Sequence, residues 1–282
     1  MSITELFASE FLRTVVLRAL AVGLLVSLCS SMLGVSLVLK RYSMIGDGLS
    51  HVGFFALAVA SVAGVGATYS LEVSVPIVIL AAVLILRLSH SDGKLNGDAA
   101  CAVVSTGAVA VGTLMYNVTG GRSGDVCNSL FGSSSVITIS NKDMLISLVL
   151  SCLVLLWFLV FTKNIFSVTF DETFARAAGV KTGAFNIALA VLTGITIVVG
   201  MKMMGSIMIS ALTAMQLTKS FKKTVILSAA ISLVCFTIGF FAACCLSLQT
   251  GAAVVTVELA AFALSCVGVK IRGIIYKSRA KH

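Results

Sequence analysis

Long apolar stretches, separated by short polar segments, dominate the pattern of residues along the 282-residue chain. A helix that crosses the hydrocarbon core of a membrane needs about 20 predominantly apolar residues. Nine stretches approach or exceed that length, which predicts an all-α polytopic transmembrane bundle of eight to nine helices. The stretches are Val15–Leu39, Ile45–Ala67, Val73–Leu88, Ala99–Tyr116, Met144–Phe161, Ala184–Gly200, Met203–Thr218, Thr224–Leu246 and Ala252–Val269.

The spacing of these stretches predicts a single membrane domain. The longest interval between them, Asn117–Asp143, is too short for a separate globular domain. We therefore expect one transmembrane domain over residues 15–270, preceded by an amphipathic surface segment over 1–14 and followed by a basic tail over 271–282. The sixth and seventh stretches are short and are joined only at Met201-Lys202, so they form either two thin spans or a hairpin that does not fully cross.

Composition agrees with this architecture and adds an orientation. Hydrophobic residues make up 59 % of the chain and charged residues only 11 %, which excludes a soluble or a disordered protein. The eight Cys residues form no C-x-x-C pair and are interpreted as packing residues. Fifteen of the 20 Lys and Arg residues fall in alternate loops and the C-terminal tail. The net charge of +9 is therefore assigned to a lipid surface rather than to nucleic acid, and the C-terminus is predicted to be cytoplasmic.

Asp47 and His51 are the leading candidates for chemistry, because ionisable groups are costly inside a span. Their i, i+4 spacing places both side chains on one face of a helix. A carboxylate and an imidazole suit zinc, manganese or iron(II), although two ligands leave the coordination shell incomplete. The alternative is structural: Asp47 caps the second helix, and His51 forms a hydrogen bond to a neighbouring helix. Glu258, in the last stretch, is a third candidate metal ligand if it lines the path of a transported ion; otherwise its side chain snorkels to the membrane surface or pairs with Lys202.

Enzymatic interpretations find little support in the sequence. It contains none of the motifs H-E-x-x-H, G-x-x-x-x-G-K-[ST] or G-x-S-x-G. Ser123 would suit an intramembrane serine protease only if it were buried, and it lies in a polar loop. Asp47 has no second Asp within a span with which to share a proton, as an intramembrane aspartyl protease requires. We therefore expect a protein that is not an enzyme.

The longest basic-side loop, Thr162–Gly183, contains a second candidate. Phe170 and Phe174 are four residues apart, which predicts a short amphipathic helix with Thr169 or Asp171 as its cap. Gly179 is expected to end this helix. Such a helix is either a simple surface helix or the docking point of a partner.

Taken together, these segments resemble a known family, the permease subunits of metal-ion ABC transporters, which import zinc, manganese or iron(II). The similar segments follow the family's order from the first span to the last. They are LGVSLVLKRYSMIGDGLSHVGFFALAVA (33–60), DAACAVVSTGAVAVGTLMYNV (98–118), LFGSSSVITISNKD (130–143), VTFDETFARAAGV (168–180), VVGMKMMGSIMISAL (198–212) and TGAAVVTV (250–257).

The resemblance implies a set of partners and roles. It implies two permease copies, a pair of cytoplasmic ATPase subunits that use ATP, and an extracytoplasmic metal-binding lipoprotein or periplasmic protein, all at a bacterial plasma membrane. No tightly bound cofactor is implied, only the transported ion. Asp47 and His51 match the family's metal-coordinating Asp-x-x-x-His. The residues that match its ATPase-coupling helix, at about 168–180, are Phe170, Asp171, Glu172, Ala175 and Gly179.

The resulting hypothesis is a permease that moves a divalent metal ion by alternating access, with zinc favoured because a His is present and manganese or iron(II) also compatible. The alternative is an ion-coupled secondary metal transporter or channel without an ATPase partner. In that case Asp47 and His51 would form a proton relay, and the helix near residue 170 would be purely structural.

Overall fold

The structure, a computed structural model, describes residues 10–64, 70–90, 97–118, 141–201, 214–218, 220–246 and 248–279. Within these ranges every regular element is a helix. The main helices, in chain order, are α2 (Glu10–Leu39), α3 (Ile45–Val62), α4 (Ser70–His90), α5 (Gly97–Val118), α7 (Asn141–Val160), α8 (Thr162–Phe170), α9 (Glu172–Ala177), α10 (Thr182–Met201), α12 (Phe221–Leu246) and α13 (Thr250–Arg279).

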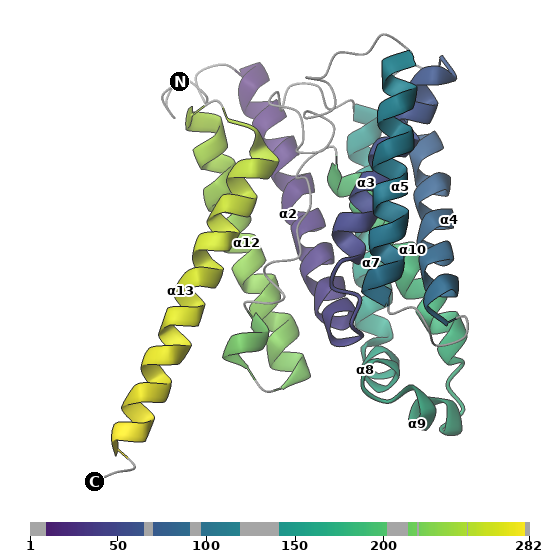
Figure 1. Ribbon diagram of the computed structural model, residues 1–282. Coiled ribbons are helices and arrows are strands. Elements are labelled where there is room, and N and C mark those ends of the chain that lie inside the picture. The colour runs from purple at the N-terminus through teal and green to yellow at the C-terminus, as the bar shows by residue number, and fades with distance from the viewer. Residues whose placement is uncertain are drawn as a thin grey trace.

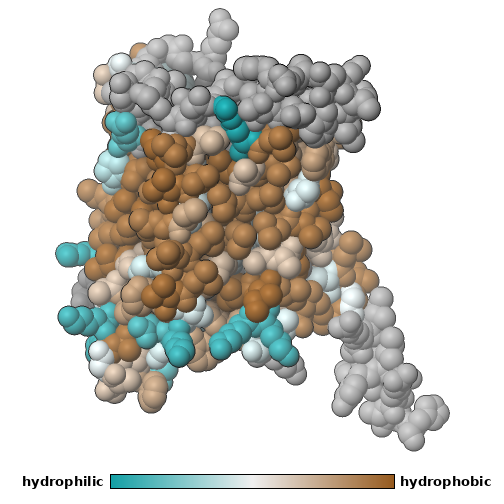
Figure 2. Space-filling view, turned by 180° about the vertical axis from the view of Figure 1, so that it is seen from behind, coloured by the Kyte–Doolittle hydropathy of each residue, from teal (hydrophilic) through white to brown (hydrophobic). Residues whose placement is uncertain are grey.

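Seven of the described helices are long and apolar enough to cross a membrane. An eighth span is added if α7 and α8, which meet at a bend of 71°, are counted together. Figure 2 shows the corresponding apolar band around the middle of the molecule, with hydrophilic side chains along its lower edge. The prediction of an all-helical membrane bundle is therefore confirmed.

Eight of the nine predicted spans coincide with described helices, with differences at their ends. The predicted seventh span, Met203–Thr218, lies mostly outside the described residues, apart from a helical turn at 214–217. Helix α2 begins at Glu10, so residues 10–14 continue the first long helix, since no Gly or Pro separates them from it. Helix α13 likewise continues to Arg279, through most of the predicted tail.

Helix α2 is the central element of the bundle, packing against α7, α10 and α12 (Figure 1). On one side of it, α3 packs against α5, and α4 against α10. On the other side, α12 packs between α2 and α13. Two clusters of buried apolar side chains reflect this division: one centres on α3, α4, α10 and the C-terminal half of α2, and the other on α12 and the N-terminal half of α2.

Polar side chains inside the bundle form hydrogen bonds between helices. The hydroxyl oxygens of Ser27 on α2 and Ser232 on α12 lie 2.5 Å apart, and Ser228 donates to the Ser31 backbone oxygen at 3.4 Å. All four side chains are buried. Such bonds help to hold two helices together inside a membrane, where the hydrophobic effect does little to drive helices to associate.

The basic segments that were predicted to share one side of the membrane lie at the same end of the bundle. Figure 1 shows the turn after α2, helices α8 and α9 and the C-terminal end of α13 at the lower end of the bundle, and the N-terminal end of α2 at the upper end. These lower segments are among those whose Lys and Arg residues were assigned to one side of the membrane. The arrangement groups them at one end of the molecule.

The α12–α13 contact depends on Gly239. A Cβ atom placed there would lie 2.6 Å from the Val254 Cα atom, a backbone atom that cannot move away alone. We predict that Gly239→Ala lowers the stability of the detergent-solubilised protein by about 1–3 kcal/mol, the usual cost of overpacking. Gly268→Ala on α13 is the control, because nothing lies within 4 Å of its Cβ position. Thermal unfolding measures both, and equal midpoints for the two variants would contradict the prediction.

Candidate functional site

Asp47 and His51 lie on an open strip of an otherwise buried helix. Most residues of α3 are buried, because its faces pack against α5, α4 and α10. The Asp47 side chain is 52 % exposed and that of His51 is 27 % exposed. Gly48, between them in sequence, allows the close approach to α5, where its Cβ position lies 3.4 Å from the Cys101 backbone oxygen. The two side chains therefore occupy the part of α3 that the described chain leaves uncovered.

The distance between the two side chains suits a shared metal ion. The Nε2 atom of His51 lies 3.6 Å from Oδ2 of Asp47. Nitrogen and oxygen donors bound about 2.0–2.2 Å from a tetrahedral zinc ion lie about 3.4 Å apart. The other ring nitrogen of His51, Nδ1, is buried and has no hydrogen-bond partner among the described residues. The pair thus presents one oxygen and one nitrogen donor, and a small side-chain movement would bring them to the separation that a bound metal ion requires.

The structural alternative for this pair is not what the geometry favours. The N-cap position of α3 is Met44, and no side chain of the helix caps it. Instead, Asp98 from α5 accepts hydrogen bonds from the Met44 backbone N–H at 3.1 Å and from the Ser43 hydroxyl. Asp47 is therefore not needed to begin the helix. The capping role of Asp98 was not predicted, because its partner is 54 residues away in sequence.

The chain supplies no third ligand to this pair within the described residues. No group of three or more His, Cys, Asp or Glu side chains that could hold a metal ion occurs there. Coordination by Asp47 and His51 would have to be completed by water, by a residue outside the described ranges or by a second copy of the chain.

Glu258, the third predicted metal ligand, is not brought to this pair. It lies on α13, which packs against α12, whereas α3 packs against α5, α4 and α10. The side chain is only 1 % exposed, and neither carboxyl oxygen has a hydrogen-bond partner among the described residues. Its predicted partner Lys202 and the loop residue Ser123 lie outside the described residues.

The predicted helix near residue 170 is present in a shorter form, α9, which follows its predicted cap Asp171 and is ended by Gly179, whereas Phe170, expected in the same helix, is the last residue of α8. Asp171 is its N-cap: the Asp171 Oδ1 atom accepts from the Phe174 backbone N–H at 2.9 Å and from the Thr173 hydroxyl at 2.5 Å. These hydrogen bonds, chiefly that from Phe174, hold the pKa of Asp171 below its usual value. Gly179 adopts φ of 84°, and the N–H groups of Gly179 and Val180 bond back to Arg176 and Ala175. This is the Schellman arrangement that favours glycine.

The motif residues of α9 and of the adjoining end of α8 point in two directions. Ala175 is buried beneath the helix, whereas Phe170 and Phe174 are largely exposed, Phe174 by 66 %. Phe170 also packs against Phe166 and Phe221. Two exposed aromatic side chains at the lower end of the bundle form an apolar surface suited to a protein partner. We call Phe170 and Phe174 the aromatic tip.

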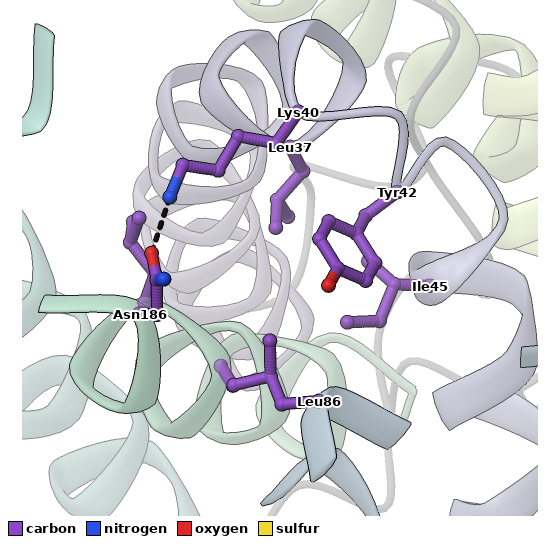
Figure 3. Close-up of a pocket in the computed structure, with 8 residues that line it drawn as sticks. Leu37, Lys40, Tyr42, Ile45, Leu86 and Asn186 are labelled. Atoms are coloured by element: carbon purple, nitrogen blue, oxygen red, sulfur yellow. Dashed lines mark hydrogen bonds between the residues drawn. The ribbon is translucent and has the colours of Figure 1, made fainter. Parts of the chain in front are cut away.

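Glu172, predicted as part of the same motif, is turned toward the bundle. Its Oε1 atom accepts hydrogen bonds from the Asn186 side-chain amide of α10 at 3.3 Å and from Arg176 at 3.4 Å. Asn186 in turn accepts a hydrogen bond from the Lys40 ammonium at the end of α2 (Figure 3). Sequence reasoning did not find Lys40 or Asn186. The sequence offered one signal, an Asn near the start of an apolar span. Its amide needs a hydrogen-bond partner once the structure buries it.

Comparison with known proteins gives consistent matches over almost the whole chain. A protein of Haemophilus influenzae named "Probable iron transport system membrane protein" is 28 % identical over 266 residues, covering 90 % of this chain and 94 % of the relative. The manganese import system permease protein ScaB of Streptococcus gordonii is 24 % identical, covering 91 % and 90 %.

A solved structure, PsaBC from Streptococcus pneumoniae in complex with Fab, has the same fold, with a TM-score of 0.76, 24 % sequence identity and coverage of 93 % of each chain. The profile of the family described as "ABC 3 transport family" matches residues 13–268. Since that match covers most of the chain, the chain belongs to the ABC 3 transport family, as a membrane-spanning transport component rather than an enzyme.

Proposed function

We propose that this chain is the permease subunit of an ATP-driven importer of a divalent metal ion in a bacterial plasma membrane. The observation that carries the proposal is the Asp47–His51 pair, two donors 3.6 Å apart on the uncovered strip of a membrane helix. Family membership and relatives named for iron and manganese transport support the same cargo class.

The donor atoms of the pair suit several divalent metal ions and do not single out one of them. The imidazole donor favours zinc, whereas the carboxylate is equally suited to manganese and iron(II). Two protein donors give weak binding, which suits a transported ion because the ion must leave as readily as it enters. A second copy of the chain, placed with its α3 strip opposite the first, would double the donors and enclose the ion between the copies.

In the proposed mechanism, the partners act at opposite ends of the bundle. A metal-binding protein outside the membrane delivers the ion, and a pair of ATPase subunits binds the aromatic tip on the cytoplasmic side. ATP binding brings the two ATPase subunits together and moves α9, and the route between the two permeases then opens to one side at a time. With the basic lower end in the cytoplasm, the C-terminus of the chain is cytoplasmic as well.

The alternative of a secondary transporter or channel has less support. Membership of an ABC transport family argues for an ATPase partner. The two exposed side chains of the aromatic tip also suit a protein partner. Metal uptake by the chain in liposomes without any ATPase would favour the alternative.

We predict that Asp47→Asn and His51→Ala each reduce ATP-dependent metal uptake by at least about tenfold, since losing even a residue that only orients a metal ligand costs 10–100-fold. Ser61→Ala, at an exposed position on the same helix, serves as control. Uptake of zinc, manganese and iron(II) is measured separately in proteoliposomes that contain the purified complex. Wild-type uptake of every metal by both variants would refute the ligand role.

We predict that Phe174→Ala weakens binding of the ATPase subunit by about tenfold, because buried aromatic anchors contribute most of the affinity in such interfaces. Leu264→Ala, which removes a similarly exposed apolar side chain from α13, should leave binding unchanged. Co-purification of the ATPase subunit with tagged permease measures the effect. Equal recovery with both variants would argue against docking at the aromatic tip.

A further inference from the structure

Three side chains form a continuous polar connection between α9 and the end of α2. The Lys40 ammonium donates to the Asn186 side-chain oxygen (Figure 3), and the Asn186 amide donates to the Glu172 carboxylate at 3.3 Å. Lys40 directly follows α2, whereas Glu172 on α9 and Asn186 on α10 lie 132 and 146 residues further along the sequence. We call Lys40, Asn186 and Glu172 the polar bridge.

The surroundings of the polar bridge make its hydrogen bonds difficult to replace. Asn186 is buried, and burial lowers the pKa of Lys40 while the negative charge of Glu172 acts in the opposite direction. Beside Lys40 and Asn186 lies a small pocket, lined otherwise by Tyr42 and apolar side chains. Breaking one hydrogen bond would leave a buried polar group without its partner, so the three side chains are constrained to move together.

The turn after Lys40 connects the polar bridge rigidly to α3. Arg41 adopts a positive φ of 63°, and Tyr42 N–H bonds back to the Leu37 oxygen at 3.0 Å, which closes the end of α2. The Tyr42 hydroxyl bonds to Ser89 on α4, and Asp98 holds the Met44 backbone N–H at the start of α3. Lys40 is therefore joined through a hydrogen-bonded turn to the first turn of α3, which contains Asp47.

We propose that Lys40 and Asn186 are positioning residues that couple movement of the docking helix α9 to the position of α3 and of its Asp47–His51 pair. This inference rests on the proposed function, since it assigns a route by which the ATPase bound at α9 acts on the metal site. Glu172 is the member of the polar bridge that moves with α9, and Lys40 is the member that moves with the turn before α3.

The test uses the complete complex, with its ATPase and metal-binding subunits, in proteoliposomes. Lys40→Met and Asn186→Leu remove the hydrogen bonds while keeping similar side-chain volumes. Each variant should assemble and hydrolyse ATP at rates close to wild type, but the number of metal ions transported per ATP should fall roughly tenfold, the scale of a lost hydrogen bond to a charged group. The double variant should be no worse than either single variant, because the residues act as one unit.

Two further variants sharpen the comparison. Glu172→Gln keeps the oxygen that accepts from Asn186 and should retain most of the transport per ATP, whereas Glu172→Leu should lose it. Lys163→Met, which removes an exposed lysine from the same end of the bundle, is the control and should behave as wild type.

The outcomes separate this inference from the function on which it rests. Wild-type transport per ATP in Lys40→Met and Asn186→Leu, or additive losses in the double variant, would overturn the coupling role. Failure of both single variants to assemble would also overturn it, since the hydrogen bonds would then serve folding. If the unmodified complex transports no metal, or does so without ATP, the proposed function itself is wrong.

Discussion

The structure depends on one constraint: the interior of a bilayer offers no water to pair with polar groups, so the chain must satisfy them itself. Long helices do this for the backbone, and bonds such as that between Ser27 and Ser232 do it for side chains at helix contacts. Against this background, groups without partners are informative because each carries a cost. The His51 Nδ1 atom and the Glu258 carboxylate are such groups among the described residues.

Helix α2 relates the two ends of the proposed mechanism. Its sides hold together the α12 half of the bundle and the α3–α10 half, and Lys40, directly after its last residue, bonds to Asn186 on α10. In the proposed mechanism, the docking helix α9 and the metal pair on α3 are both connected to this helix end, the first through the polar bridge and the second through the turn before α3.

Most of the fold followed from the length of the apolar stretches, since a spanning helix has few alternatives in sequence or in structure. The ends of α9 were also predictable, because Asp171 and Gly179 cap a helix through contacts with residues a few positions away. Spacing likewise placed Asp47 and His51 on one strip. It could not reveal that α5 provides the Asp98 contact, that Asn186 lies between Lys40 and Glu172, or that Glu258 is enclosed by α12, because periodicity identifies a face and not its neighbour.

The open strip of α3 has a consequence for how the cell controls the metal. With two donors per chain, an isolated permease holds an ion only loosely in competition with water. If two copies complete the site, occupancy follows mass action in the paired form, as with any ligand that binds only the associated state. Newly made, unassembled chains would then neither withdraw scarce metal from the cell nor carry it through the membrane unregulated.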